Sequence, residues 1–447
     1  MATWAQQDLR ARSSIIEAAL RRESQWLSQE RILLLFWMAA LATVVAMGIG
    51  GSTGWDARIC GKAIHSLRSG ADPYAAGISD QQSAGSDAIA RQGRARSLYA
   101  YSPMTLPLLR VLGLWPNWLL SLFFCTATGM GFILQVRAGY LLAEADEQRW
   151  LKFLLPAVAF FPGLVTDDAI LSGNLAYLLY GLVLTAAVPG WKRDQWRWFY
   201  FAVLVASVFK APLLTLLAFP VLVGKRQWFG ATSTGVVGLA LFAGEAWLRP
   251  DLCAEYLKTI RIMFDVGHDF GYGPVGVLGD FLWRHGRPYS QATTLAYLAF
   301  AGGMLLFLLF LARQARRGNC PRQVWVSVAL MGTFLLNPRI MKYDMAAITI
   351  PMLLIAWRGM RAVQGWTIGR TGKNARETRR MIAMGAGCFL AANLITVLGP
   401  RWVPVELIVL LAVFSLGTSL LQQPAEVKLE IFVPSPSLLE LPVPEEV

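Results

Sequence analysis

Long apolar runs separated by short polar turns occupy the chain from about residue 32 to residue 420. A helix needs about 20 mostly apolar residues to cross the hydrocarbon core of a bilayer, and about 12 runs approach that length. The pattern therefore predicts an all-α, polytopic membrane protein with about 12 transmembrane helices. The predicted spans are roughly 32–50, 116–138, 150–166, 174–190, 196–208, 210–223, 227–247, 293–313, 322–337, 344–357, 382–398 and 402–420.

One of these regions is interrupted. Lys210-Ala211-Pro212 breaks the apolar stretch 196–223, which forms either two short helices or one re-entrant hairpin. A lysine inside an apolar run is costly and has a functional role by default, although its long side chain can also reach the membrane surface.

Basic residues predict the sidedness. The arginine-rich segment 1–31 is predicted to be cytoplasmic, and the transmembrane domain covers 32–420. Alternation of the spans then puts four basic turns on the same side, at 192–193, 225–226, 313–322 and 358–380. Two long outer loops remain, 51–100 and 248–292, in which we expect short interfacial helices. Loop 51–100 is itself basic, but long loops translocate regardless of charge. The Pro-rich, acidic tail 421–447 is predicted to be disordered and cytoplasmic.

Composition agrees with a membrane protein. Hydrophobic residues make up 55% of the chain and charged residues 15%, against about 25% charged in an average soluble domain. The net charge of +13 could suggest a nucleic-acid partner, but the basic residues lie in short runs between apolar stretches, which argues against one. The cysteines form no CxxC pair, so no structural zinc site is expected. A disulfide between Cys60 and Cys253 would be allowed outside the cell, but no feature favours it.

Candidate chemistry gathers on the outer side. Asp56 follows the first predicted span and starts a segment, 57–69, whose apolar residues recur at steps of three and four, as in a helix lying along the membrane surface. Asp56 could simply cap this helix. Alternatively, it is a carboxylate held at the lipid boundary that accepts a proton from a hydroxyl.

Cations occur at two distant outer turns. Lys210 lies in one, and Arg339 and Lys342 lie in the other, followed by Tyr343 and Asp344. Three cations are enough to hold a phosphate or diphosphate, although Arg339 and Asp344 could also pair only with each other. The adjacent acids Asp167-Asp168 leave open that a divalent ion binds, but no acidic cluster has evident metal-ligand spacing.

Further polar motifs lie in the outer loops and turns. They are Asp72-Pro73-Tyr74, Tyr101-Ser102-Pro103, Gly173-Asn174 and His268. Local sequence preferences alone predict that the first two are turns anchored by tyrosines, and that Asn174 can cap a helix.

Together these motifs resemble the GT-C superfamily of integral membrane glycosyltransferases, and most of all glycosyltransferase family 87. The resemblance rests on Asp56, Gly70 with Asp72-Pro73-Tyr74, Tyr101-Ser102-Pro103, Gly173-Asn174, Lys210 with Pro212, and Pro338-Arg339 with Tyr343-Asp344, in family order over residues 30–400. The chain departs from the family where Tyr-Pro-Pro is common (Tyr101-Ser102-Pro103), where Gly-Gln is common (Gly173-Asn174), and at a histidine position of some members, occupied here by Lys342 and Tyr343.

The resemblance implies a GT-C-like fold and transfer of a hexose-like sugar from a polyprenyl-phosphate donor to a glycan or glycolipid, on the outer face of the inner membrane. It implies that Asp56 is the catalytic base. Lys210, Arg339 and Lys342 would bind the donor phosphate, without a metal or another cofactor. Asp72, Tyr74, Tyr101, Asn174, His268, Tyr343 and Asp344 are the candidate substrate-binding residues. A transporter or lipid flippase would also explain many spans with charges, but it predicts inverted repeats and mid-membrane acids that the sequence does not display. A relative that has lost activity and serves as a scaffold is the third alternative.

Overall fold

The computed structural model describes residues 54–83, 98–144, 173–266, 271–287, 291–317, 320–371 and 405–422, with a few positions between these ranges. Within them every regular element is a helix, which confirms the predicted all-α class for this part of the chain. The elements in order are α2 (Trp55–Arg68), α3 (Pro73–Gln82), η1 (Pro103–Thr105), α5 (Leu106–Leu112), α6 (Asn117–Tyr140), α9 (Ala176–Arg193), α10 (Arg197–Phe209), η2 (Ala211–Leu217), α11 (Ala218–Val223), α12 (Trp228–Leu248), α13 (Pro250–Asp265), α14 (Pro274–Arg284), α15 (Gln291–Arg317), α16 (Arg322–Leu335), η3 (Lys342–Ile348), α17 (Thr349–Thr371) and α19 (Val405–Leu421).

Three described helices are long and apolar enough to cross a membrane: α6, α12 and the Thr293–Arg317 part of α15. The predicted spans 32–50, 150–166 and 382–398 lie outside the described residues. The other predicted spans coincide with helices, several of which are shorter than a bilayer requires. A membrane protein is therefore supported, and the total of about 12 spans stays a prediction.

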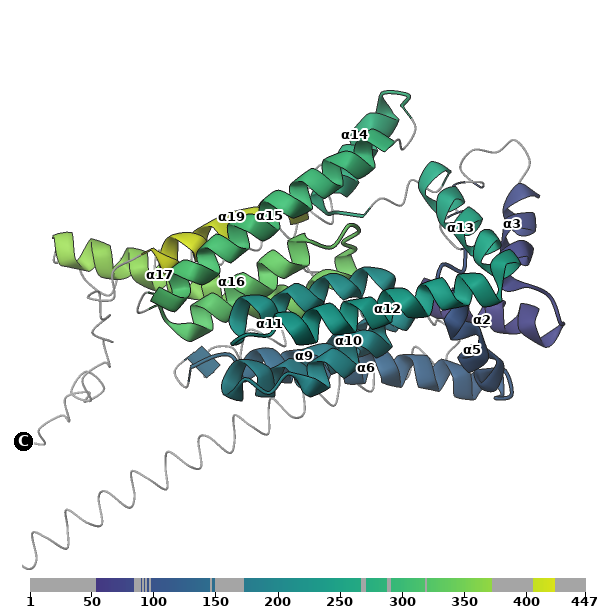
Figure 1. The fold of residues 1–447 in the computed structure, drawn as a ribbon, viewed down its shortest axis with the longest axis horizontal. Helices are drawn as coiled ribbons and strands as arrows, with labels where there is room; N and C mark the ends of the chain where they lie inside the picture. Colours follow the sequence, from purple (N-terminus) through teal and green to yellow (C-terminus); the bar gives the residue numbers. More distant parts are fainter. Residues whose placement is uncertain are drawn as a thin grey trace, which may run out of the picture.

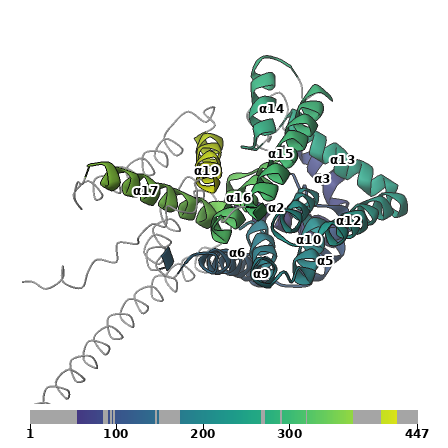
Figure 2. The same cartoon turned by 60° about the vertical axis from the view of Figure 1, so that its left-hand side comes forward.

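The helices form a bundle with a cap at one end. α6, α9, α10 and α12 lie side by side, and α15, α16, α17 and α19 form the neighbouring part of the bundle (Figures 1 and 2). Three helices of the two long loops, α2, α3 and α13, gather at one end together with α5, whereas α14 of the second loop packs against α15 (Figure 1). A continuous apolar core runs through the bundle, with Tyr177, Phe219 and Phe334 almost fully buried in it.

Lys210 lies at the tip of a helical hairpin. α10 ends at Phe209, Lys210 has an extended backbone, and η2 and α11 follow. The ring of Phe219 in α11 returns to within 6.2 Å of Phe199 and 5.6 Å of Trp196, measured between ring centroids. The chain therefore reverses at the lysine, as the break in the apolar pattern suggested.

Three of the basic turns that alternation puts on one side lie at the opposite end of this hairpin. A side-chain oxygen of Asp194 accepts the Lys225 N–H at 3.1 Å, and the Arg316 guanidinium donates to the carbonyl of Gly224 at 3.3 Å. The turns 192–193 and 225–226 and the end of α15 therefore share one end of the bundle, and Lys210 lies at the other.

The predicted helix at 57–69 is α2. Its residues Ala57, Cys60, Ala63 and Ile64 are buried, as the periodicity predicted. Asp72 caps α3, because its carboxylate accepts the Tyr74 N–H at 3.0 Å. The described cysteines, Cys60 and Cys253 among them, are free thiols, so no disulfide joins these two.

Candidate active site

A cavity of about 390 Å³ lies where α2, the loop before η1, the tip of the α10–η2 hairpin, α13 and the turn after α16 meet. Within the described part of the chain, its charged lining consists of two carboxylates, Asp56 and Asp344, and two cations, Lys210 and Arg339. Most of the remaining wall is apolar or aromatic: Ile59, Leu98, Phe209, Pro212, Leu213, Tyr256, Leu257, Ile260, Met263, Phe264 and Val275. The combination of a charged centre and apolar walls suits an amphiphilic ligand.

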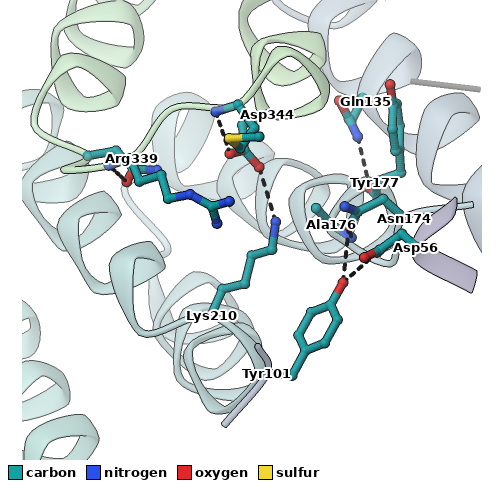
Figure 3. A network of polar contacts seen from close by, with 11 residues as sticks. Asp56, Tyr101, Gln135, Asn174, Ala176, Tyr177, Lys210, Arg339 and Asp344 are labelled. Atoms are coloured by element: carbon teal, nitrogen blue, oxygen red, sulfur yellow. Dashed lines mark hydrogen bonds and ion pairs between the residues drawn. The ribbon is translucent and has the colours of Figure 1, made fainter. Parts of the chain in front are cut away.

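Asp56 is not a helix cap. Gly54 is the N-cap of α2, and Asp56 lies inside the first turn of the helix. Asp56 is 5% exposed, and its carboxylate accepts a hydrogen bond from the Tyr101 hydroxyl at 2.6 Å (Figure 3). The sequence left two interpretations of Asp56 open, and this geometry favours a carboxylate held in place for chemistry.

Burial raises the pKa of Asp56 from 3.8 to about 6. The hydrogen bond from Tyr101 and the positive charges of Lys210 and Arg339 partly offset this rise, whereas the negative charge of Asp344 adds to it. A carboxylate with this pKa is mostly ionised at pH 7 and is still basic enough to take up a proton, which are the two properties that a general base needs.

Tyr101 is held in place by residues at the start of α9. Burial raises the pKa of its phenol, followed in importance by the negative charge of Asp56, so the hydroxyl stays protonated and can donate. Oδ1 of Asn174 lies 3.3 Å from the same hydroxyl and accepts the Ala176 N–H at 2.8 Å, at the start of α9 (Figure 3). Gly173 has φ of +65°, and a Cβ there would lie 3.0 Å from the Cβ of Ala57. Only glycine lets this turn approach α2 so closely without strain.

Lys210 reaches from the hairpin tip into the cavity. Its ammonium lies 3.4 Å from Oδ1 of Asp344 and 4.3 Å from the ring centroid of Tyr343. Oδ2 of Asp344 accepts the Met341 N–H at 3.0 Å, so the carboxylate also fixes the turn that begins η3. The lysine therefore has both an anionic and an aromatic partner, and its ammonium faces the cavity (Figure 3).

Arg339 is positioned by its backbone. Its N–H donates to the side chain of Asn337 at 3.1 Å, and the carbonyl of the next residue, Ile340, accepts the Tyr272 N–H at 2.6 Å. Gly271 precedes Tyr272 with φ of +77°, and a Cβ there would lie 2.7 Å from the Ile340 carbonyl. The guanidinium extends toward the Lys210–Asp344 pair (Figure 3).

The structure therefore brings together six of the candidate residues on one cavity: Asp56, Tyr101, Lys210, Arg339, Tyr343 and Asp344. Three others do not line it. Asp72 caps α3, Tyr74 is buried and donates to the Tyr101 carbonyl at 2.7 Å, and Asn174 supports Tyr101 from outside the lining. His268 and the side chain of Lys342 lie outside the described residues.

No group of three His, Cys, Asp or Glu side chains that could hold a metal occurs in the described part of the chain. Asp167-Asp168 lies outside that part. The expectation that the protein needs neither a metal nor another cofactor stays a prediction.

Sequence reasoning missed the contribution of α13. Tyr256, Ile260 and Met263, with Leu257 and Phe264 beside them, line the cavity from this helix. A signal was present, because these residues recur at helical steps of three and four in a loop otherwise rich in charges. Tyr180 and Asn337 complete the polar lining.

Residues 99–338 match the profile of glycosyltransferase family 87. The chain belongs to glycosyltransferase family 87. No curated protein and no solved structure matches it. The family-87 resemblance drawn from the motifs is thereby confirmed, and the protein is a membrane glycosyltransferase.

The matched range of this family-87 protein contains Tyr101, Asn174 and Lys210 and ends one residue before Arg339. Asp56 precedes the matched range. The case for Asp56 and Arg339 therefore comes from the cavity that they share with Lys210 rather than from the extent of the match.

The pKa of Asp56 leads to a prediction about pH. If Asp56 is the general base, the form that works is its carboxylate, which is present above a pH of about 6 and is lost as the pH falls through that value. We expect the rate of sugar transfer to fall about tenfold per pH unit below the pKa. Because the Tyr101 hydroxyl lowers this pKa, Tyr101→Phe should move the acidic limb to higher pH.

Tyr99→Phe is the matched control for that prediction, because the Tyr99 hydroxyl pairs with Thr105 at 2.6 Å and is not among the groups that shift the pKa of Asp56. Initial rates across pH 5 to about 8 in one buffer series provide the measurement. An acidic limb that stays in place in Tyr101→Phe, or moves to lower pH, would contradict the role given to this hydrogen bond.

Proposed function

We propose that this glycosyltransferase moves a hexose-like sugar from a polyprenyl-phosphate donor to a hydroxyl of a glycan or glycolipid, at the outer face of the cell inner membrane. The observation that carries the proposal is the single cavity in which a hydrogen-bonded carboxylate, Asp56, faces two cations, Lys210 and Arg339, between apolar walls.

A lipid-linked donor fits the lining. The phosphate of a polyprenyl-phosphate sugar is anionic, and Arg339 can hold it with two N–H groups while Lys210 acts as a point charge. The isoprenoid chain is apolar, and the inner faces of α13 and the hairpin tip offer it aromatic and aliphatic side chains such as Phe209, Tyr256 and Ile260. A water-soluble nucleotide sugar would gain nothing from such walls.

The reaction can be written with these groups. The acceptor oxygen attacks the anomeric carbon of the donor, and its proton passes to the Asp56 carboxylate. The bond between the anomeric carbon and the phosphate oxygen breaks, and the electron pair stays with the departing polyprenyl phosphate. Lys210 and Arg339 stabilise the negative charge that grows there, which is the largest single contribution in many enzymes.

The position of the basic turns supports the outer side. Lys225 and Arg316 lie at the end of the hairpin remote from the cavity, and a membrane protein keeps such clusters in the cytoplasm. The cavity would then open on the extracytoplasmic side, where a lipid-linked sugar and a cell-envelope glycan can meet.

The test is a transfer assay with purified full-length protein in nanodiscs, a radiolabelled polyprenyl-phosphate hexose and a panel of glycan and glycolipid acceptors. Labelled product that depends on an acceptor supports the proposal. A nucleotide sugar that serves equally well without the lipid phosphate would overturn the donor class. Movement of intact donor across the bilayer without any new glycosidic bond would favour a flippase instead.

A further inference from the structure

A second cavity, of about 280 Å³, lies between α2 and the beginning of α6. It is on the opposite face of α2 from the active site. Asp56 and Ile59 line the first cavity, whereas Arg58, His65 and Arg68 line the second. Nothing in the proposed sugar transfer uses these three basic residues.

The polar lining of this second cavity is one-sided in charge. Three side chains come from basic residues of one face of α2, and Asn117 and Ser121 from the first turns of α6 add neutral hydrogen-bonding groups. Among the lining residues that the structure describes, none carries a carboxylate. A Cβ added at Gly61, on the same wall, would meet no atom within 4 Å, so the space beside it is open.

Arg68 gives this site a rigid base. Its guanidinium donates to the carbonyls of Gly113 and Trp115, both at 2.5 Å, and lies 3.4 Å from Oδ1 of Asn117. All three acceptors are neutral, so the positive charge of Arg68 remains uncompensated by them. The bonds tie the end of α2 to the turn between α5 and α6.

The position of the cavity at the end of a membrane-spanning helix indicates a lipid as its ligand. α6 is one of the three described helices long and apolar enough to cross a bilayer, and it begins at Asn117, on the cavity wall. The end of a spanning helix lies at the level of the lipid headgroups. Leu114 is 83% exposed and Trp118 65% exposed beside it, as expected of side chains that face acyl chains and the interface.

We propose that this second cavity binds the phosphate of an anionic phospholipid headgroup. The phosphate lies among Arg58, His65 and Arg68, and the acyl chains run along the exposed apolar surface at Leu114 and Trp118. Basic pockets beside transmembrane helices are a recurrent mode of headgroup recognition. The site is separate from the donor site and goes beyond the proposed function.

Binding of phosphatidylglycerol to the purified full-length protein tests this assignment, with phosphatidylcholine as the neutral lipid and glycerol phosphate as the soluble phosphate. The test variant is Arg58→Gln with His65→Gln, because both side chains are exposed and Arg68 has a structural role. Lys62→Gln is the matched control, since Lys62 is on α2 but pairs with Asp80 at 3.9 Å and does not line the cavity.

We expect phosphatidylglycerol to bind more tightly than phosphatidylcholine, and the double variant to lose about tenfold or more in affinity, as for loss of a hydrogen bond to a charged group. Lys62→Gln should bind like the unmodified chain. Equal affinities of the double variant and the control would overturn the proposal. Glycerol phosphate bound as tightly as the lipid would overturn the assignment to a membrane lipid. Because lipid binding is read directly, its failure is distinguishable from a failure of sugar transfer.

Discussion

Asp56→Asn is expected to lower the rate of sugar transfer by at least about 100-fold, the lower end of the range for general base catalysis. Asparagine keeps the size of the side chain and can still accept the Tyr101 hydroxyl, but its amide cannot take up the proton of an attacking hydroxyl. The removal of a buried charge, whose pKa of about 6 reflects costly desolvation, should leave the fold intact.

Asp80→Asn provides the control for Asp56→Asn. Asp80 belongs to the same long loop but has an exposed side chain that pairs with Lys62. Both variants should show the thermal unfolding midpoint of the unmodified protein, and only Asp56→Asn should lose turnover with saturating donor and acceptor. A folded Asp56→Asn protein with near-normal turnover would remove Asp56 from the mechanism.

The sequence predicted much of the helical framework because the apolar pattern is long and strongly periodic. The breaks at Lys210 and at Asp72-Pro73 are where the structure has the hairpin tip and the start of α3. The number of spans could not be counted in the same way. Helices such as α10 and α16 are apolar but too short to cross a bilayer alone, so their length does not say how they sit in the membrane.

Of the candidate site residues, Asp56, Lys210 and Arg339 lie on one cavity in the structure, whereas their roles stay predictions. The sequence indicated these three residues because a charge at the end of an apolar helix is costly unless it has a partner or a function. The sequence could not tell which charges pair. It left open whether Arg339 and Asp344 pair only with each other, and in the structure Lys210, 134 residues away, forms an ion pair with Asp344. Long-range pairing depends on the packing of the bundle, which local patterns do not encode.

Other roles were hidden for the same reason. The hydroxyl of Tyr101 reaches Asp56 only because Gly173 lets the start of α9 lie against α2. For the loop 248–292 the sequence predicted only short interfacial helices, and it is the packing of α13 over the cavity that makes this helix part of the site. Asp72, next to Pro73 and Tyr74, was a candidate substrate-binding residue. In the structure its carboxylate accepts the Tyr74 N–H and caps α3.

The second large prediction concerns the phosphate clamp, which is the pair of cations Lys210 and Arg339. Arg339 is the easier of the two to test by substitution. Arg339→Gln keeps the length and polarity of the side chain but removes the charge and the planar pair of donors. If the guanidinium holds the phosphate of the donor in the transition state, kcat/KM for the donor should fall about 100-fold, as on removal of one oxyanion-stabilising donor. The KM for the acceptor should change little. Arg339→Lys should recover only part of the loss, because an ammonium cannot bind two oxygens in parallel.

Arg284→Gln is the control for Arg339→Gln, since Arg284 lies in α14, pairs with Asp280 at 2.7 Å and does not line the cavity. In Arg339→Gln, a rise in the KM for the acceptor as large as the rise in the KM for the donor would show that the arginine shapes the whole site and does not recognise the phosphate.

Lys210 needs a different design, because it has a structural partner. The Lys210 side chain is 18% exposed and that of Asp344 4%, so Lys210→Gln leaves the buried Asp344 carboxylate without this ion pair. Breaking such a pair costs roughly 3–5 kcal/mol, which would lower activity through unfolding alone. The double variant Lys210→Gln with Asp344→Asn removes both charges and should regain most of that stability. If Lys210 also binds the donor phosphate, the stable double variant should still use the donor poorly, with acceptor kinetics unchanged. Recovery of donor use together with stability would limit Lys210 to holding the turn at Asp344, and the clamp would then consist of Arg339 alone.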